Sequence, residues 1–318
     1  MTTVLVTGGA GFIGSHLVEA LLAQGERVRV LDDLSTGKLK NLAGVIDQIE
    51  FIEGSVVDAV TVRQAAEGVE VVYHLAAIAS VPQSMAEPVQ TELVNTVGTM
   101  NLLQAARAAN ARRLVLSSTC AVYGDEPTLP KIETMLPQPK SPYAISKLAA
   151  EHYCRVYYES FGLETIVLRY FNVFGPRQDP SSAYSGVISI FVDKLAAGIA
   201  PTIFGDGQQT RDFVFVQDVV QANILAANTP QVAGGTFNIG TGRQVTVQHL
   251  FETLRGIFEC EVTPLYAPGR SGDVLHSYAD PSQAVTLLGW QAQVTLETGL
   301  KQLVESYKCD FRESNTGL

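Results

Sequence analysis

Residues 3–14 of the chain read Thr3-Val4-Leu5-Val6-Thr7-Gly8-Gly9-Ala10-Gly11-Phe12-Ile13-Gly14. The apolar run at residues 3–6 predicts a buried strand, and the apolar spacing of residues 16–22 predicts a helix after it. Because the glycines between them carry no side chains, the backbone can turn tightly and approach a pyrophosphate at the helix N-terminus. This strand–loop–helix context predicts a dinucleotide site that includes Gly8, Gly11, Phe12 and Ile13, although the glycine spacing differs from the usual G-x-G-x-x-G.

Short apolar runs alternate with helical patterns through the first two-thirds of the chain. Further strand-like runs lie at residues 28–31, 49–52, 71–75, 114–117 and 165–168. Such alternation indicates βαβ units with right-handed crossovers. We therefore expect an α/β fold with two parts. Residues 1–171 are expected to form a Rossmann-type doubly wound parallel sheet, to which later strands return. Residues 172–318, which prolines and glycines interrupt, are expected to form mainly a smaller α/β lobe.

Composition excludes several classes of protein. The chain has 318 residues, 46% hydrophobic and 17% charged, with a net charge of −10. This acidity and the lack of a basic stripe argue against binding to nucleic acid. No apolar run is long enough to span a membrane, and a strand pattern begins at once where a signal peptide would lie, so we expect a cytoplasmic protein. The four cysteines form no C-x-x-C pair, so neither a metal site nor a disulfide framework is expected.

Three further segments fit a dinucleotide. The second strand ends in Leu31-Asp32-Asp33, where a carboxylate can accept bonds from the adenosine ribose hydroxyls and would repel a 2′-phosphate, so NAD is favoured over NADP. Small residues in Leu75-Ala76-Ala77 allow the cofactor to pass close to the backbone. Asn95, in the next helix, could bond the cofactor or order a neighbouring loop.

Thr119, Tyr143 and Lys147 are the candidate catalytic residues. The Tyr-x-x-x-Lys spacing puts a phenol and an ammonium one helical turn apart on one face. A phenol is a poor base at neutral pH. An adjacent ammonium and the charge of an oxidised nicotinamide would each favour the phenolate. We therefore expect Tyr143 to accept a hydroxyl proton while hydride leaves the same carbon, which is redox chemistry at a carbinol.

Several motifs together make the chain similar to the extended short-chain dehydrogenase/reductase family, specifically its nucleotide-sugar 4-epimerases. They are "TGGAGFIG", "HLAA", "SSTCAVYGD", "SPYAISK", "RYFNVFGPRQDP", "GDGQQTRDFVFVQD" and "NIGTG". The resemblance implies that Tyr143 is the general base and acid, that Lys147 orients the nicotinamide ribose, and that Thr119 bonds the reacting hydroxyl. One position departs from the family, since Ser55 follows Gly54 where relatives usually have an Asp that meets adenine. We therefore expect the cofactor contact at Ser55 to be weaker or to be made by its backbone atoms.

The residues after Thr119 discriminate between the reactions of the family. Dehydratases of this kind place Asp-Glu directly after the Thr, and decarboxylases usually keep a Glu at the second position. Here Cys120 and Ala121 occupy these positions, and neither performs the acid–base work of a carboxylate. The resemblance then implies oxidation and re-reduction at C4 of the sugar, with rotation of a 4-keto intermediate between the two steps.

The resemblance also implies a UDP-sugar site in the C-terminal part. Arg211, Arg270 and Asp273 match the family's phosphate and ribose clamp, Asn172 would bond the phosphate or sugar, and Phe204 would stack near uracil or belong to the core. Relatives restricted to glucose and galactose have a Tyr where this chain has Ser277. Since a serine leaves room for an N-acetyl group, and Gln178 and Gly186 would line such a pocket, UDP-N-acetylglucosamine is the expected substrate.

Alternatives to this substrate, and to catalysis itself, stay open at this point. The protein could act only on UDP-glucose and UDP-galactose, be a non-catalytic nucleotide-binding regulator, or be a net reductase of a keto sugar. The helices near residues 94–109 and 144–161 carry apolar positions beyond one core stripe, and relatives dimerise through two helices per subunit, so we expect a homodimer.

Overall fold

A parallel sheet forms the centre of the protein in the computed structural model, which describes residues 2–178, 186–269 and 274–316. Within these residues the sheet has seven strands in the order β11-β6-β5-β4-β1-β2-β3, and every neighbouring pair is parallel. The strands are β1 (Thr3–Thr7), β2 (Arg27–Asp32), β3 (Glu50–Glu53), β4 (Val71–His74), β5 (Arg113–Thr119), β6 (Glu164–Tyr170) and β11 (Thr236–Ile239). The predicted doubly wound Rossmann-type sheet is confirmed.

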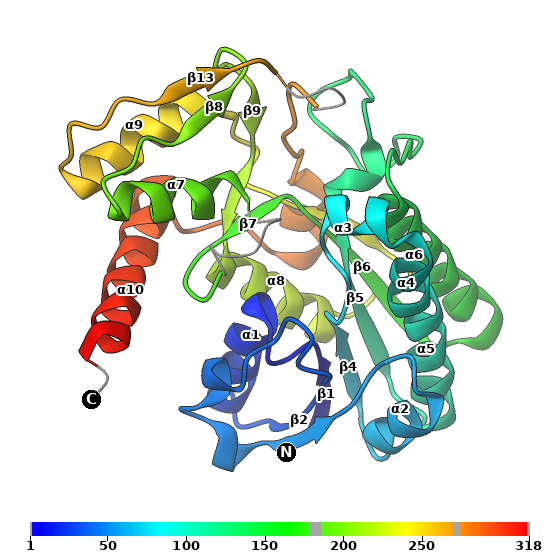
Figure 1. The fold of residues 1–318 in the computed structure, drawn as a ribbon. Coiled ribbons are helices and arrows are strands. Elements are labelled where there is room, and N and C mark those ends of the chain that lie inside the picture. The colour runs from blue at the N-terminus through cyan, green and yellow to red at the C-terminus, as the bar shows by residue number, and fades with distance from the viewer. Residues whose placement is uncertain (1, 179–185, 270–273, 317–318) are drawn as a thin grey trace.

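Helices cover both faces of this sheet because its strands are apolar on both sides (Figure 1). Alternate residues of β1 show the division: Val4 and Val6 belong to one buried cluster and Leu5 to the other. The first cluster contains residues of α1 (Phe12–Ala23) and α8 (Val216–Asn228). The second contains residues of α2 (Ala59–Ala66), α5 (Gly98–Ala108) and α6 (Pro142–Phe161).

The strand order changes direction between β1 and β4. From β1 the chain runs outward through β2 to β3, then crosses to β4 on the other side of β1 and continues through β5 to β6. A crevice forms outside the carboxyl ends of the strands at such a point, and ligands of open α/β sheets bind there. The loops after β1 and β4 therefore mark the expected site.

The C-terminal part packs around a third buried cluster, which includes Phe191, Phe215 and Phe251. Its strands pair as β7 (Asn172–Phe174) with β10 (Phe213–Phe215), β9 (Thr210–Arg211) with β12 (Val245–Thr246), and β8 (Thr202–Phe204) with β13 (Leu265–Ala267). Its helices are α7 (Val187–Ala196), α9 (Val247–Phe258) and α10 (Leu296–Thr316). In Figure 1 these helices lie to one side of the main sheet, beyond α1.

Shorter helical segments complete the fold. They are α3 (Val81–Ala86), α4 (Pro88–Glu92), the π-helical turns η3 (Leu93–Val97) and η5 (Ala284–Leu288), and the 3-10 turns η1 (Leu39–Leu42), η2 (Ile46–Gln48) and η4 (Cys120–Tyr123). Among the described residues, no helix combines the length and the apolar character that a membrane span requires.

Candidate active site

The backbone where β1 turns into α1 is packed so closely that Gly8 and Gly14 have no room for a side chain. Gly8 has a φ of +71°, and a Cβ there would lie 2.7 Å from the backbone nitrogen of Ala76. A Cβ on Gly14 would lie 2.1 Å from the carbonyl oxygen of Gly8. Gly11 precedes α1 without a side-chain cap, and the first turn of α1 carries no acidic residue. The amides at this helix end are therefore arranged as an anion-binding terminus.

A cavity of about 480 Å³ extends from this loop along the carboxyl ends of β1, β2, β4 and β5. Most of the predicted cofactor residues line it: Gly8, Gly11, Phe12, Ile13, Asp32, Asp33, Leu75, Ala76, Ala77, Tyr143 and Lys147. Residues that are far apart in the sequence, from the glycine loop to Tyr143 on α6, thus line one cavity.

The two acidic residues after β2 differ in their surroundings. Asp32 is buried, and its carboxylate accepts bonds from the amides of Ala10 and Leu34, each at 2.9 Å. Burial raises the pKa of Asp32, and these two bonds offset part of the rise. Asp33 is exposed and accepts bonds from the amide and hydroxyl of Ser35. Asp32 therefore braces the glycine loop from the wall of the cavity.

Two predicted cofactor residues do not line the cavity. Ser55 accepts a bond from the amide of Val57, while its neighbours Gly54 and Val56 form the wall. The Asn95 side chain is buried and bonds both backbone groups of Ile78, at 2.8 and 3.0 Å, and the hydroxyl of Ser146, at 2.9 Å. Asn95 thus orders the loop after β4, which was one of the two roles considered for it.

A relay of buried hydrogen bonds around His74 lies directly behind this loop. Thr99 donates its hydroxyl proton to the Asn95 carbonyl at 2.5 Å, so it must accept from His74 Nε2, 2.8 Å away. His74 Nδ1 then accepts from the Thr7 hydroxyl at 2.8 Å, and Thr7 Oγ1 accepts from the Ala76 amide. Burial lowers the pKa of His74 to about 3. A neutral His74 with its proton on Nε2 therefore joins β1, β4 and α5.

The three predicted catalytic residues converge from two elements. Thr119 ends β5, and its side chain accepts a bond from the Ala121 amide at 3.1 Å. Tyr143 and Lys147 lie on α6, which begins at Pro142 after a cap in which the Ser141 side chain accepts from the Ala144 amide. The Thr119 side chain hydrogen-bonds Tyr143. One hydroxyl and one phenol are thus brought together beside the cavity, which Tyr143 and Lys147 line and Thr119 does not.

The electrostatics of this cluster are governed by burial. Burial raises the pKa of Tyr143 to about 12, and the bond with Thr119 offsets only part of that rise. Lys147 donates to the carbonyl of Ser117 at 2.8 Å, and burial lowers its pKa to about 8. In the protein without cofactor, burial therefore dominates the pKa of each group. The lowering of the Tyr143 pKa expected from Lys147 together with an oxidised nicotinamide stays a prediction for the cofactor-bound enzyme.

Cys120 lies between the catalytic cluster and the C-terminal part. Its thiol packs against Tyr123, Phe171 and Ala279, and it hydrogen-bonds the Ser277 side chain. Burial raises the pKa of Cys120 to about 11. A thiol with this pKa stays protonated at neutral pH, so it supplies no anionic base next to Thr119.

The predicted substrate residues come together in part. Asn172 on β7 is bonded through its amide to the carbonyl of Asp212, which follows Arg211, and the Ser277 amide donates to the carbonyl of Thr210, which precedes it. The side chains of Asn172, Arg211 and Ser277 thus come from adjoining backbone segments. Arg211 itself donates to the carbonyls of Thr210 and Leu275.

The other predicted substrate residues are less closely connected. Phe204 on β8 is half-buried, and its carbonyl accepts from the Gln209 side chain. Gln178 donates to the Val173 carbonyl at 3.4 Å, and among the described residues its Oε1 has no hydrogen-bond partner. Arg270 and Asp273 lie outside the described residues.

Asp212 organises this region, and sequence reasoning missed it. Its side chain is fully buried and accepts bonds from the amide and hydroxyl of Thr241, the amide of Gly242 and the amide of Ala279. Burial raises the pKa of Asp212, although these donors lower it in part. The carboxylate therefore ties the segment that carries Ser277 to the one that carries Arg211. Its position within "QTRDFVF" was the only available signal.

A parallel sheet with a glycine loop at its topological switch point, and a Tyr-x-x-x-Lys helix beside the same cavity, defines a dinucleotide-dependent enzyme of the short-chain dehydrogenase/reductase class. Residues 4–240 match the family described as "NAD dependent epimerase/dehydratase family". The chain belongs to this family. The expectation of an epimerase-type enzyme with NAD as its cofactor is confirmed.

Individual relatives are similar along almost the whole chain. A UDP-glucose 4-epimerase of Mycolicibacterium smegmatis is 44% identical over 96% of this chain and 98% of its own length. The crystal structure of a UDP-glucose 4-epimerase with UDP-glucose from Thermotoga maritima is 41% identical, has a TM-score of 0.93, and is matched over 98% of this chain and 100% of that one. A UDP-N-acetylglucosamine 4-epimerase from Methanobrevibacter ruminantium, in complex with UDP-N-acetylmuramic acid, is 37% identical with a TM-score of 0.93, over 97% and 99%.

The residues of this chain fit NAD. Because Gly8 and Gly14 have no side chains, only backbone atoms of Gly8, Gly14 and Ala76 stand where a diphosphate must lie close. The N-terminal amides of α1, which no side chain caps, can donate to that diphosphate. Asp32 stands at the carboxyl end of β2, where the adenosine ribose is held in this fold. Tyr143 and Lys147 line the same cavity as the glycine loop and Asp32.

Proposed function

We propose that this protein catalyses the 4-epimerisation of UDP-hexoses, with UDP-N-acetylglucosamine and UDP-N-acetylgalactosamine as the main pair and UDP-glucose and UDP-galactose as a second pair. The observation that carries the proposal is the group of Thr119, Tyr143 and Lys147 at the dinucleotide cavity, which Tyr143 and Lys147 line, next to a protonated Cys120 rather than a carboxylate. The similar proteins named as epimerases of both substrate types support this chemistry.

The proposed mechanism assigns proton movement to Tyr143 and orientation to its neighbours. NAD, when bound, supplies reversible oxidation at the carbinol carbon and a positive charge near the phenol. Tyr143 Oη accepts the proton of the C4 hydroxyl and returns it after the 4-keto sugar has turned its other face. Thr119 holds the same sugar oxygen by a second hydrogen bond. Since burial alone keeps Tyr143 protonated, the cofactor's charge and the Lys147 ammonium must act together to form the phenolate.

The proposed substrate site uses the C-terminal part of the chain, and residues 1–171 and 172–318 stay our division between the cofactor and sugar-nucleotide domains. Arg211 and Arg270 are proposed to bind the diphosphate, a geometry that suits guanidinium groups. Asp273 is proposed to bond ribose hydroxyls, Asn172 the phosphate or sugar, and Phe204 the uracil. The cytoplasmic location expected from the sequence also stays a prediction.

Ser277 is proposed to set the sugar preference. It is half-buried, and its side chain bonds Cys120 beside the catalytic cluster. A small residue here leaves space for an N-acetyl group at C2 of the sugar, with Gln178 and Gly186 on the other side. Replacement by Tyr is expected to abolish conversion of the acetylated pair and to spare UDP-glucose.

The decisive experiment incubates the purified protein with UDP-N-acetylglucosamine and with UDP-glucose separately, without added NAD, and resolves the 4-epimers by NMR. We expect both to be converted by wild type and by Ser277→Ala, and only UDP-glucose by Ser277→Tyr. Conversion of UDP-glucose alone by wild type would retain the chemistry and refute the open pocket. If Tyr143→Phe is as active as wild type, the proposed proton transfer is wrong. A non-catalytic regulator is not favoured, because the reacting side chains are assembled.

A homodimer is also proposed. An apolar surface, which we call the helix-pair surface, consists of Met85, Val89, Leu93, Val97 and Ile145 on α3, α4, η3 and α6. Val89 is 72% exposed and Met85 62%. The first four lie on consecutive short helical segments, and α6 packs directly against α4 and η3. Exposed apolar side chains on adjoining helices suit a self-complementary interface.

A further inference from the structure

A buried ion pair lies behind the catalytic residues. Glu151 is on α6, one turn after Lys147, and Arg169 is on the adjacent strand β6. Both side chains are only 6% exposed, and Arg169 Nη2 lies 2.7 Å from Glu151 Oε2. Arg169 Nε donates to the other carboxylate oxygen at 3.1 Å, so the pair is bidentate. Such a geometry holds both groups in fixed positions.

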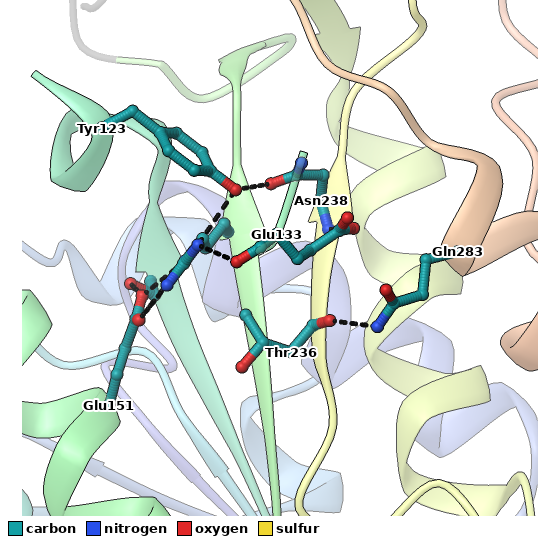
Figure 2. Close-up of polar contacts among 8 residues, drawn as sticks. Tyr123, Glu133, Glu151, Thr236, Asn238 and Gln283 are labelled. Carbon is teal, nitrogen blue, oxygen red and sulfur yellow. Dashed lines mark hydrogen bonds and ion pairs between the residues drawn. The ribbon is translucent and has the colours of Figure 1, made fainter. Parts of the chain in front are cut away.

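The pair contacts the catalytic segment on both sides of Thr119. Ser118, which directly precedes Thr119, donates its hydroxyl to Glu151 Oε1 at 2.5 Å. Tyr123, which ends the 3-10 turn after Thr119, accepts a bond from Arg169 Nη1 at 3.0 Å. Figure 2 shows Tyr123 and Glu151 facing each other, with hydrogen bonds from each to the guanidinium group between them. The segment that carries Thr119 is therefore held at both ends by one ion pair.

The Tyr123 end is itself anchored to the edge of the sheet. Its hydroxyl donates to Asn238 Oδ1 on β11 at 2.7 Å, as Figure 2 shows. The backbone amide of Asn238 donates to Glu133 Oε1 at 2.7 Å. Because every group in this chain of bonds has a partner, a shift of the Thr119 turn would break several buried bonds at once.

We propose that Glu151 and Arg169 are positioning residues for the epimerase reaction: the pair clamps the Thr119 turn from both sides and supports the positive charge of Lys147. The inference rests on the proposed function for its effect on turnover. The clamp acts on the hydroxyl that must meet the sugar oxygen together with Tyr143. The negative charge of Glu151 acts on the Lys147 ammonium. Among the described residues, the ammonium makes one hydrogen bond, to the carbonyl of Ser117.

The charge part follows from the groups around Lys147. Burial lowers the pKa of Lys147 to about 8, and the negative charge of Glu151 opposes that decrease. The titratable and charged groups near it are Glu151, Cys154 and Tyr143 on α6, the neutral His74 on β4, and Arg169 on β6, which faces Glu151. Loss of the Glu151 charge removes the negative charge one helical turn from Lys147, and it leaves the positive charge of Arg169 without its carboxylate partner. Both changes disfavour the ammonium, so Lys147 must lose its proton at a lower pH.

The same two strands offer a matched control. Arg113 and Glu164 begin β5 and β6, are paired in the strand register, and form another ion pair, with 2.6 Å between Arg113 Nη2 and Glu164 Oε2. This arginine is also buried. Glu164→Gln therefore removes a partner from a buried arginine at the opposite ends of the strands from Thr119. Glu164 is more exposed than Glu151, at 38% against 6%, so this variant controls for the loss of a carboxylate beside a buried arginine and leaves the catalytic turn untouched.

The first test measures turnover per NAD-loaded enzyme for Glu151→Gln, Ser118→Ala, Tyr123→Phe and the control Glu164→Gln. We expect kcat to fall by about 10- to 100-fold in Glu151→Gln, and several-fold in Ser118→Ala and Tyr123→Phe, with KM nearly unchanged, since misplaced groups lower the rate rather than the affinity. Glu164→Gln should keep the wild-type kcat. Wild-type kcat in both Ser118→Ala and Tyr123→Phe would overturn the clamp, even if Glu151→Gln does not fold.

The second test follows Lys147 without any substrate. In lysine-13C-labelled holoenzyme, the Cε resonance of Lys147, assigned by its loss in Lys147→Met, reports protonation. We expect its titration midpoint to be lower in Glu151→Gln than in wild type, and unchanged in Glu164→Gln and Ser118→Ala. Equal midpoints in wild type and Glu151→Gln would refute the charge part. An inactive wild type with the expected midpoints would instead refute the proposed function and leave the charge part standing.

Discussion

Acid should destabilise this protein through His74. The ring is 1% exposed, and the relay to Thr7 and Thr99 requires the neutral form with its proton on Nε2. Burial lowers its pKa from 6.5 to about 3. Below pH 6.5 the unfolded chain therefore binds a proton that the folded protein excludes. Stability is complete above that pH and falls as the pH decreases toward 3.

The size of the effect follows from the two pKa values. With one pKa unit equivalent to about 1.4 kcal/mol, the unfolded state gains about 2 kcal/mol at pH 5 relative to neutral pH. Other buried groups contribute with the opposite sign as the pH falls, because burial raises the pKa values of Asp32, Asp212 and Asp218. Only a comparison with a variant that lacks His74 isolates its contribution.

The assay is urea denaturation of wild type and His74→Gln at pH 7.5 and pH 5. The glutamine loses relay bonds and should be less stable at both pH values, but it cannot titrate. Wild type should therefore lose about 2 kcal/mol more than the variant between the two pH values. An equal loss in the two proteins would mean that His74 is not held neutral in the folded state, and the relay would be wrong.

Two further predictions concern the cofactor loop and the helix-pair surface. Gly14→Ala should abolish NAD retention and destabilise the protein by roughly 1–3 kcal/mol, because its Cβ would meet the Gly8 carbonyl oxygen at 2.1 Å; Gly256→Ala, in open space on α9, should instead keep NAD and stabilise slightly. Bound NAD is measured after acid release, and retention of NAD by Gly14→Ala would contradict the close packing. Val89→Glu should yield monomers in analytical ultracentrifugation, whereas Ile199→Glu, 50% exposed outside the helix-pair surface, should not; a dimer in both would place the interface elsewhere.

Much of the main domain could be predicted because its signals are local. Each of the apolar runs predicted as strands forms part of the central sheet, and parallel pairing places their carboxyl ends at one edge. The spacing of Tyr143 and Lys147 needs only the geometry of one helix. The glycines at positions 8 and 14 are likewise explained by the strand–loop–helix context in which they occur.

Other features depended on contacts between distant residues. The bonds of Asn95 to Ile78, of Asp212 to Thr241 and Ala279, and of Glu151 to Ser118 join residues far apart in the chain, and no spacing rule connects them. Sequence position was also insufficient at Ser55, because its neighbours Gly54 and Val56 line the cavity and Ser55 does not.

By itself the sequence predicted the order of strands and helices in the main domain and the glycine loop of the dinucleotide site, and it indicated candidate reacting side chains, because periodicity and residue spacing act over a few residues. Only the tertiary structure decided their protonation. The pKa of Tyr143 is raised and that of Lys147 lowered by burial. Desolvation is a property of everything packed around a group, which comes from many segments of the chain at once.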